Sequence, residues 1–219
     1  MNIPLSNRLH ACCNFIHPGD RVADIGCDHG YLGIYLLTQG IAKSVIASDV
    51  NPQPLESAAR NCNKFGVTDK MKLYLSDGAK NIPRDFDTLV CAGMGGDTMI
   101  HILENASWLR SDRYRLILQC QSKTPMLRSY LSEKGWHIAR ELVMRDGRFL
   151  YTVMEVLWQP DAPRLTLAQT YISPALLENS GEALREYYDR IVEGLRLAVT
   201  HQQDAEKKAI LEELENLGL

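Results

Sequence analysis

The feature that most constrains the fold is a mostly apolar run that ends in two closely spaced glycines. Residues 22–25 are typical of a buried strand, Gly26 and Gly30 follow it, and a helical pattern begins at Tyr31. Glycine lets the backbone pass close to a ligand, and the N-terminus of the next helix offers free N–H groups. We therefore expect a strand, a turn and a helix that together bind a small ligand.

Short β-branched runs and helical patterns alternate through the first 158 residues, which is typical of a parallel sheet covered by helices. Two further extended runs, residues 137–144 and 148–158, are joined by Arg145–Asp146–Gly147, which is a hairpin signal. One of these two runs must therefore be antiparallel to the rest. The expected parallel strands are residues 21–25, 44–48, 71–75, 88–92 and 115–119.

Five parallel strands, a helix and a closing hairpin are the strand inventory of the class I methyltransferase sheet. This is a Rossmann-like α/β fold of seven strands, in which the last strand is inserted antiparallel beside the fifth. A plain dinucleotide-binding sheet would continue with another parallel strand. The hairpin signal therefore favours the methyltransferase arrangement.

The composition changes after Trp158. Residues 159–163 are typical of a linker, and the tail that follows has no strand signal. Its apolar residues at helical spacing predict a pair of helices that separate near residues 200–204. We expect a methyltransferase domain over residues 1–158 and a coiled-coil-like helical domain over residues 164–219. The sequence leaves open whether the tail packs on its own sheet, on a second subunit or on a large substrate.

The composition, with 45% hydrophobic and 23% charged residues among 219, is that of an ordinary soluble protein. The six cysteines form no Cys-x-x-Cys pair and have no zinc spacing, so we expect reduced thiols and no metal. No segment approaches the ~20 consecutive apolar residues of a membrane span, and the N-terminus lacks a secretory pattern. We expect a cytoplasmic protein, away from membranes, that is a monomer or a weak homodimer.

The charge is unevenly distributed along the chain. The formal net charge is only -3, but residues 108–148 contain nine bases and four acids, whereas residues 178–219 contain five bases and ten acids. A near-neutral total can therefore hide a basic face that meets phosphate groups. Chance alternation of sign on helix surfaces is the competing interpretation.

Acidic residues after successive strands point to a cationic ligand. Asp28 stands where the second glycine of a dinucleotide-binding turn lets pyrophosphate approach, and a carboxylate there would repel a diphosphate. It would tolerate the ammonium and sulfonium groups of S-adenosylmethionine. Asp49 is placed to accept ribose hydroxyls, and Asp77 with Gly78 is placed to accept the adenine amino group. For each residue the alternative is a loop aspartate that caps the next helix.

Several glycines follow the fourth expected strand, in Ala92–Gly93–Met94–Gly95–Gly96. They predict close backbone approach, either by the methionine part of the cofactor or by a flat substrate base. The chain lacks the Asn/Asp-Pro-Pro-Tyr segment that many amino methyltransferases carry here. That omission favours methylation of a ring nitrogen, which has its own lone pair.

Together these motifs resemble the bacterial tRNA (adenine-22-N1)-methyltransferases, over about the first 155 residues. The segments that carry the resemblance are Leu5-Ser6-x-Arg8-Leu9, Ala23-Asp24-Ile25-Gly26-x-Asp28-His29-Gly30-Tyr31-Leu32, Ala92-Gly93-Met94-Gly95-Gly96, Ile117-Leu118-Gln119, Arg128-x-x-Leu131, Glu141 and Gly147 to Tyr151. One departure is Gln119-Cys120-Gln121-Ser122-Lys123, where the family usually has Gln-Pro-Asn. The departure leaves the cofactor unchanged and bears on the target nucleotide.

The resemblance implies methyl transfer from S-adenosylmethionine to N1 of an adenine, at position 22 in the D-loop of tRNA. Asp28 and His29 are the candidate catalytic residues, for accepting a proton or fixing the base. The expected cofactor-binding residues are Asp24, Gly26, Asp28, Gly30, Asp49, Val50, Asp77, Gly78, Ala92, Gly93 and Met94. The expected substrate-binding residues are Arg8, Tyr31, Gly95, Gly96, Gln119, Gln121, Lys123 and Arg128.

Three other functions remain open at this point. One is a small-molecule methyltransferase of the same fold, against which the basic stretch is a weak argument. Another is a protein that binds S-adenosylmethionine without catalysis and recruits a partner through its acidic helical tail. Nicotinamide binding is disfavoured by Asp28.

Overall fold

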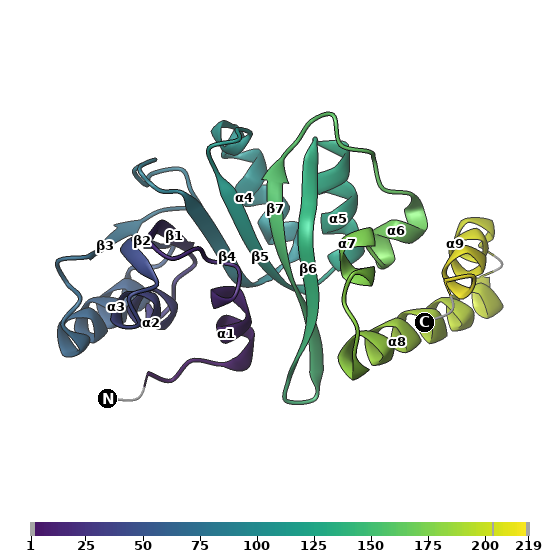
Figure 1. Cartoon of the computed structure of the whole chain (residues 1–219), viewed down its shortest axis with the longest axis horizontal. Helices are drawn as coiled ribbons and strands as arrows, with labels where there is room; N and C mark the ends of the chain where they lie inside the picture. Colours follow the sequence, from purple (N-terminus) through teal and green to yellow (C-terminus); the bar gives the residue numbers. More distant parts are fainter. Residues whose placement is uncertain (1–2, 203, 218–219) are drawn as a thin grey trace.

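The structure, a computed structural model, describes residues 3–202 and 204–217. A seven-stranded sheet runs through the centre of the molecule in the order β3-β2-β1-β4-β5-β7-β6 (Figure 1). The strands are β1 (Asp20–Ile25), β2 (Ala42–Asp49), β3 (Met71–Leu75), β4 (Thr88–Gly95), β5 (Arg115–Ser122), β6 (Trp136–Asp146) and β7 (Phe149–Trp158).

The sheet has the topology that the hairpin signal predicts. Strands β1 to β5 are parallel where they pair, and β7 is antiparallel to both β5 and β6. Since two antiparallel pairings restore the original direction, β6 runs parallel to β5. The predicted insertion of the last strand beside the fifth is confirmed.

Helices cover both faces of the sheet, and the alternation of side chains along each strand divides the core in two. Val22, Val90 and Ile117 pack with α1, α2 and α3, whereas Ile25 and Leu118 pack with α4 and α5 on the other face. Asp24 has the same strand parity as Val22, so it faces α1 and α2. These helices are α1 (Asn7–Cys13), α2 (Tyr31–Thr38), α3 (Pro52–Phe65), α4 (Gly96–Glu104) and α5 (Thr124–Glu133), with a short 3-10 helix at Ser107–Leu109.

The tail contains the expected helical pair, α8 (Glu182–Gln202) and α9 (Ala205–Glu215), and both helices contribute to a small separate core. Two short helices precede the pair and were not predicted: α6 (Leu167–Tyr171) and α7 (Pro174–Leu177). Capping side chains begin both of them. Thr166 and Gln169 form a capping box at α6, and Ser173 accepts the Leu176 N–H at α7.

A buried ion pair joins the tail to the sheet, and it corrects one prediction. Arg128 on α5 is fully buried and donates to Glu141 of β6 at 2.8 Å and to the carbonyls of Thr170 and Tyr171 at 2.9 and 2.6 Å. Ser173 donates to the same carboxylate at 2.5 Å. The prediction that Arg128 contacts the substrate is therefore wrong, because all of its side chain is inside the protein.

Within residues 3–202 and 204–217, no helix is long and apolar enough to cross a membrane. The same residues contain no group of three or more His, Cys, Asp or Glu side chains that could hold a metal ion. All six cysteines are free thiols.

Candidate functional site

A small cavity of about 90 Å³ lies where α1 meets the carboxyl ends of β1 and β4. This is the edge at which open parallel sheets bind ligands. Seven of its lining residues are ones that the sequence predicted as site residues, from three separate segments of the chain. The lining residues are Arg8, Leu9, Asp24, Gly26, Cys27, Asp28, His29, Tyr31, Leu32 and Ala92.

The turn after β1 has the unusual backbone that its glycines predict. Gly26, Asp28 and Gly30 all have positive φ angles, of 71°, 50° and 73°. Aspartate tolerates this left-handed region better than most residues, but glycine is the residue that adopts it without strain. The N–H groups of Gly26 and Cys27 donate to the Ser48 carbonyl of β2 at 2.8 and 2.9 Å, so the turn is fixed to the neighbouring strand.

Asp24 places a buried carboxylate under this turn. The residue is only 3% exposed, and its Oδ2 atom has no hydrogen-bond partner among the described residues. Burial raises the pKa of the Asp24 carboxyl to about 7, the negative charge of Asp49 adds to the rise, and the backbone N–H of Gly33 opposes it. A cation bound at this carboxylate would restore its ionised form.

The other predicted acids follow along the same edge. Asp49 ends β2, and its two carboxylate oxygens accept the N–H groups of Asp28 at 3.3 Å and Asn51 at 2.9 Å. The adjacent Val50 is 61% exposed. Asp77 lies beyond β3 and forms an exposed ion pair with Lys80, whose hydrogen bond holds the pKa of that carboxyl below its usual value.

The glycines after β4 have distinct roles. Gly93 has a φ of 79°, and its N–H donates to Oε1 of Gln119 at 2.9 Å. Gln119 is fully buried, so it positions the Gly93 turn, and its predicted direct contact with substrate is wrong. A side chain at Gly26 would collide with the terminal methyl of Met94, which shows that Met94 reaches across to the first glycine turn.

Gly96 has a structural role at the start of α4. It is buried, and a Cβ atom there would lie 2.7 Å from the Lys123 carbonyl, so its small size lets α4 begin close to α5. At Gly95, in contrast, a Cβ atom would meet the side chains of Asp97 and Ser122. Nζ of Lys123 lies 2.9 Å from Oδ2 of Asp97, with both side chains more than half exposed.

Arg8 stands at the mouth of the cavity. Its Nη1 lies 3.5 Å from Oδ2 of Asp146, at the end of β6, and its Nε has no hydrogen-bond partner in the part of the chain that the structure describes. A Cβ atom at Gly93 would lie about 4 Å from the guanidinium of Arg8 and from the amide of Gln121. Sequence reasoning missed Asp146 because it treated Arg145–Asp146–Gly147 only as a turn.

The candidate catalytic residues lie together on the exposed side of the turn. Nε2 of His29 is 3.6 Å from Oδ1 of Asp28, and both side chains are more than half exposed. The His29 ring also lies beside Tyr31, with centroids 5.9 Å apart. The three residues therefore form one polar and aromatic rim at the start of α2.

Most of the basic stretch is paired with acids. Of its nine bases, six form ion pairs in the structure, which places a carboxylate beside each of those charges. The pairs are Arg113–Asp85, Arg115 with Asp20 and Glu155, Lys123–Asp97, Arg128–Glu141, Arg140–Glu155 and Arg145–Glu186. The stretch therefore presents a weaker basic face than the sequence alone predicts.

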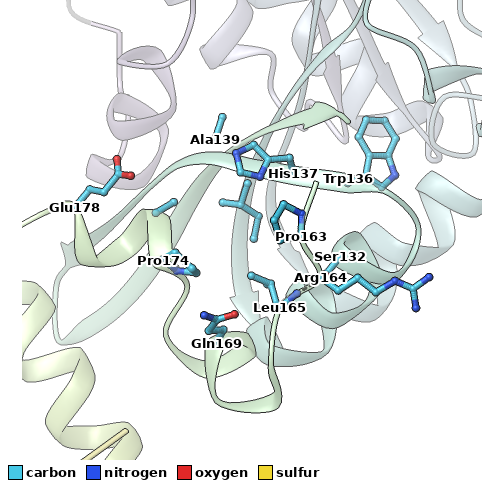
Figure 2. A pocket seen from close by; sticks show the side chains of 12 residues that line it. Ser132, Trp136, His137, Ala139, Pro163, Arg164, Leu165, Gln169, Pro174 and Glu178 are labelled. Atoms are coloured by element: carbon cyan, nitrogen blue, oxygen red, sulfur yellow. Dashed lines mark hydrogen bonds between the residues drawn. The ribbon is translucent and has the colours of Figure 1, made fainter. Parts of the chain in front are cut away.

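A larger cavity, of about 260 Å³, lies away from these residues (Figure 2). It is lined by the start of β6 around His137, by the linker at Pro163 and Leu165, and by α6 and α7. Because β6 runs parallel to β5, its first residues lie at the opposite edge of the sheet from the glycine turns. None of the predicted site residues lines this cavity, so its size does not make it the reaction site.

Comparison with known proteins identifies the family of the chain. A protein-family model described as a methyltransferase domain matches residues 5–154. The tRNA (adenine(22)-N(1))-methyltransferase of Bacillus subtilis strain 168 is 31% identical over 153 residues, which cover 69% of this chain and 64% of that enzyme. The chain belongs to the tRNA (adenine-22-N1)-methyltransferase family. The family resemblance found in the motifs is therefore confirmed.

Solved structures of this family match nearly the whole chain. A putative tRNA (m1A22) methyltransferase from Streptococcus pneumoniae, in complex with S-adenosyl-L-methionine, has a TM-score of 0.86 and 26% identity over 97% of this chain and 98% of its own. The B. subtilis m1A22 tRNA methyltransferase has a TM-score of 0.82 and 25% identity over 98% of this chain and 96% of its own. The family fold therefore extends into the helical tail.

Proposed function

We propose that this chain transfers a methyl group from S-adenosylmethionine to N1 of adenine 22 in the D-loop of tRNA. The observation that carries the proposal is the buried Asp24 carboxylate, which lacks a hydrogen-bond partner among the described residues and lies under the glycine turn of a methyltransferase domain. Such a carboxylate suits a cationic ligand, because an unpaired buried charge is costly. The named B. subtilis enzyme acts on adenine 22 of tRNA, which supplies the proposed acceptor.

The residues along the carboxyl edge fit this cofactor by their chemistry. Asp24 would pair with its ammonium group, Asp49 would accept its ribose hydroxyls and Asp77 its adenine amino group. Bound S-adenosylmethionine supplies a methyl group on a positively charged sulfur. The full proposed set is Asp24, Gly26, Asp28, Gly30, Asp49, Val50, Asp77, Gly78, Ala92, Gly93 and Met94.

The acceptor nitrogen needs alignment more than activation. N1 of adenine is neutral and has a lone pair, so side chains that align the base and exclude water supply most of the acceleration. N1 lies on the Watson–Crick edge, so the base must leave its stack to enter the site. The proposed substrate contacts are Arg8, Tyr31, Gly95, Gly96, Gln121 and Lys123.

Methylation at N1 leaves a positively charged base, whose amino proton a carboxylate or an imidazole can accept. Asp28 and His29 lie next to each other at the rim of the cavity, with their side chains exposed to an incoming base. We assign this pair to proton acceptance or to orientation of the base.

The two proposed domains, residues 1–158 and 164–219, would then have different roles. The first binds the cofactor, and the second adds surface beside the site for a large RNA. The separate apolar core of α8 and α9 supports this division. The Arg128–Glu141 pair holds the two parts in one arrangement.

The deciding experiment incubates the purified chain with radiolabelled S-adenosylmethionine and unmodified bacterial tRNA, and then maps reverse-transcription stops. We expect label in tRNA and a new stop at adenine 22. Label confined to small molecules, or no transfer at all, would overturn the proposal in favour of a small-molecule enzyme or a binding protein.

A further inference from the structure

The β6–β7 hairpin extends past the sheet at the edge that carries the site. The ladder between β5 and β7 ends at Cys120 opposite Thr152, whereas β6 and β7 stay paired as far as Asp146 and Phe149. Residues 144–151, called the hairpin tip below, therefore lie beyond the part of β7 that pairs with β5. Figure 1 shows this tip between α1 and α8.

Contacts to both of these helices fix the hairpin tip. Asp146 pairs with Arg8 of α1, whereas the neighbouring Arg145, whose side chain points to the opposite face, pairs with Glu186 of α8. Phe149 is directly opposite Asp146 in the ladder, so it shares the face that α1 covers. The same Arg8 lines the small cavity, which connects the hairpin tip to the site through one side chain.

The hairpin tip carries two stacked aromatic rings, of which Phe149 is exposed and Tyr151 is half-buried. Phe149 is 48% exposed, and its ring stacks on that of Tyr151 with centroids 5.9 Å apart and an interplanar angle of 26°. The guanidinium of Arg148 lies 4.9 Å from the centre of the Phe149 ring. Among the described residues Arg148 has no ion-pair partner, so its positive charge is not neutralised by a carboxylate.

Stacked rings with an unneutralised arginine are the combination that proteins use for unpaired nucleotides, because every base has a π-face and every nucleotide a phosphate. Extrusion of a target base also leaves its neighbours in the strand unstacked. We propose that Phe149 and Tyr151, with Arg148, stack an unpaired base that flanks the target adenine in the substrate RNA. This inference rests on the proposed function and adds a positioning surface to it.

The test compares two substitutions at one exposed position. Phe149→Leu removes the ring but keeps an apolar side chain, and Phe149→Trp keeps a ring. Leu197→Ala, at another exposed apolar position, is the matched control. We expect Phe149→Leu to raise the Kd and KM for unmodified tRNA roughly tenfold, in line with the loss of one base stack. The kcat, the cofactor affinity and the melting temperature should stay unchanged, and Phe149→Trp and Leu197→Ala should match the wild type.

Each remaining outcome separates this inference from the proposed function. Equal tRNA affinity for wild type and Phe149→Leu would overturn the stacking site even if adenine 22 is methylated. Binding of tRNA that depends on the ring, without methylation, would keep the stacking site and overturn the proposed acceptor. If Phe149→Leu abolished self-association in sedimentation and left tRNA binding unchanged, the hairpin tip would be an interface between copies of this chain.

Discussion

At the scale of single residues, Asp24 is held where its own ionisation is unfavourable. The folded pKa of about 7 lies well above the ordinary value of 3.8 for an aspartate, chiefly because the carboxyl is buried. The folded state therefore binds this proton more tightly than the unfolded state. Stability from this group is complete below about pH 4 and is lost as the pH rises towards 7.

Asp24→Asn should remove that loss. We expect equal free energies of unfolding for wild type and variant near pH 4. At pH 8 the cofactor-free variant should be more stable by about 4 kcal/mol. Urea unfolding at the two pH values measures the difference, and a variant whose advantage does not change with pH would contradict the burial argument.

Asp49→Ala should weaken the binding of S-adenosylmethionine by roughly 1 to 3 kcal/mol, through loss of charged hydrogen bonds. The Asp49 carboxylate also receives the Asp28 N–H, so its removal loosens the glycine turn. Calorimetric titration measures the change, with the exposed Asp69→Ala as control. Unchanged affinity would remove Asp49 from the site.

At the scale of elements, the Arg128–Glu141 pair determines how the tail sits on the sheet. Arg128→Ala leaves the buried Glu141 carboxylate without its positive partner and two tail carbonyls without the Arg128 donor, and should cost roughly 3 to 5 kcal/mol of stability. Arg128→Met with Glu141→Leu should cost less, because both charges are then removed together. Denaturant unfolding of the two single variants and the double variant checks this. A loss in the double variant equal to the sum of the two single losses would show that the pair is not coupled.

The sequence could predict elements whose signals are local. Residues 71–75 were predicted as a strand with the observed ends, and the Arg145–Asp146–Gly147 turn predicted the hairpin. The short α6 was missed although its capping signal, Thr166 followed by Gln169, is readable, because a five-residue helix shows too little periodicity.

Burial is harder to predict at functional positions. Arg128 looked like a phosphate contact because its partners, Glu141 and the carbonyls of α6, are 13 to 43 residues away and their proximity is created by the fold. Gln119 lies in β5, and the burial of a strand side chain depends on the neighbouring strands and helices, which the local sequence does not show. The glycine turns, in contrast, depend on local backbone conformation, and the sequence predicts these turns correctly.

At the scale of the whole molecule, ion pairs reduce the charge available to RNA. Nine phosphate contacts would give a slope of log affinity against log salt of roughly -6 to -8. Only Arg110, Lys134 and Arg148 of the basic stretch have no ion-pair partner among residues 3–202 and 204–217, so we expect a slope shallower than about -3. Filter binding of tRNA from 50 to 200 mM salt measures the slope; a value of about -6 or steeper would show that the paired bases open to bind phosphate.

The buried guanidinium of Arg128 also has a consequence for protein engineering. Arg128 donates to peptide carbonyls of the tail. If the tail is replaced by that of a relative, the main-chain carbonyls of the new tail must therefore lie at the same positions on the sheet. We expect a chimera that exchanges residues 164–219 between relatives to fold best when the new α6 segment keeps its carbonyls within reach of Arg128. A tail whose carbonyls lie elsewhere would leave Arg128 paired with Glu141 but without two of its hydrogen-bond acceptors.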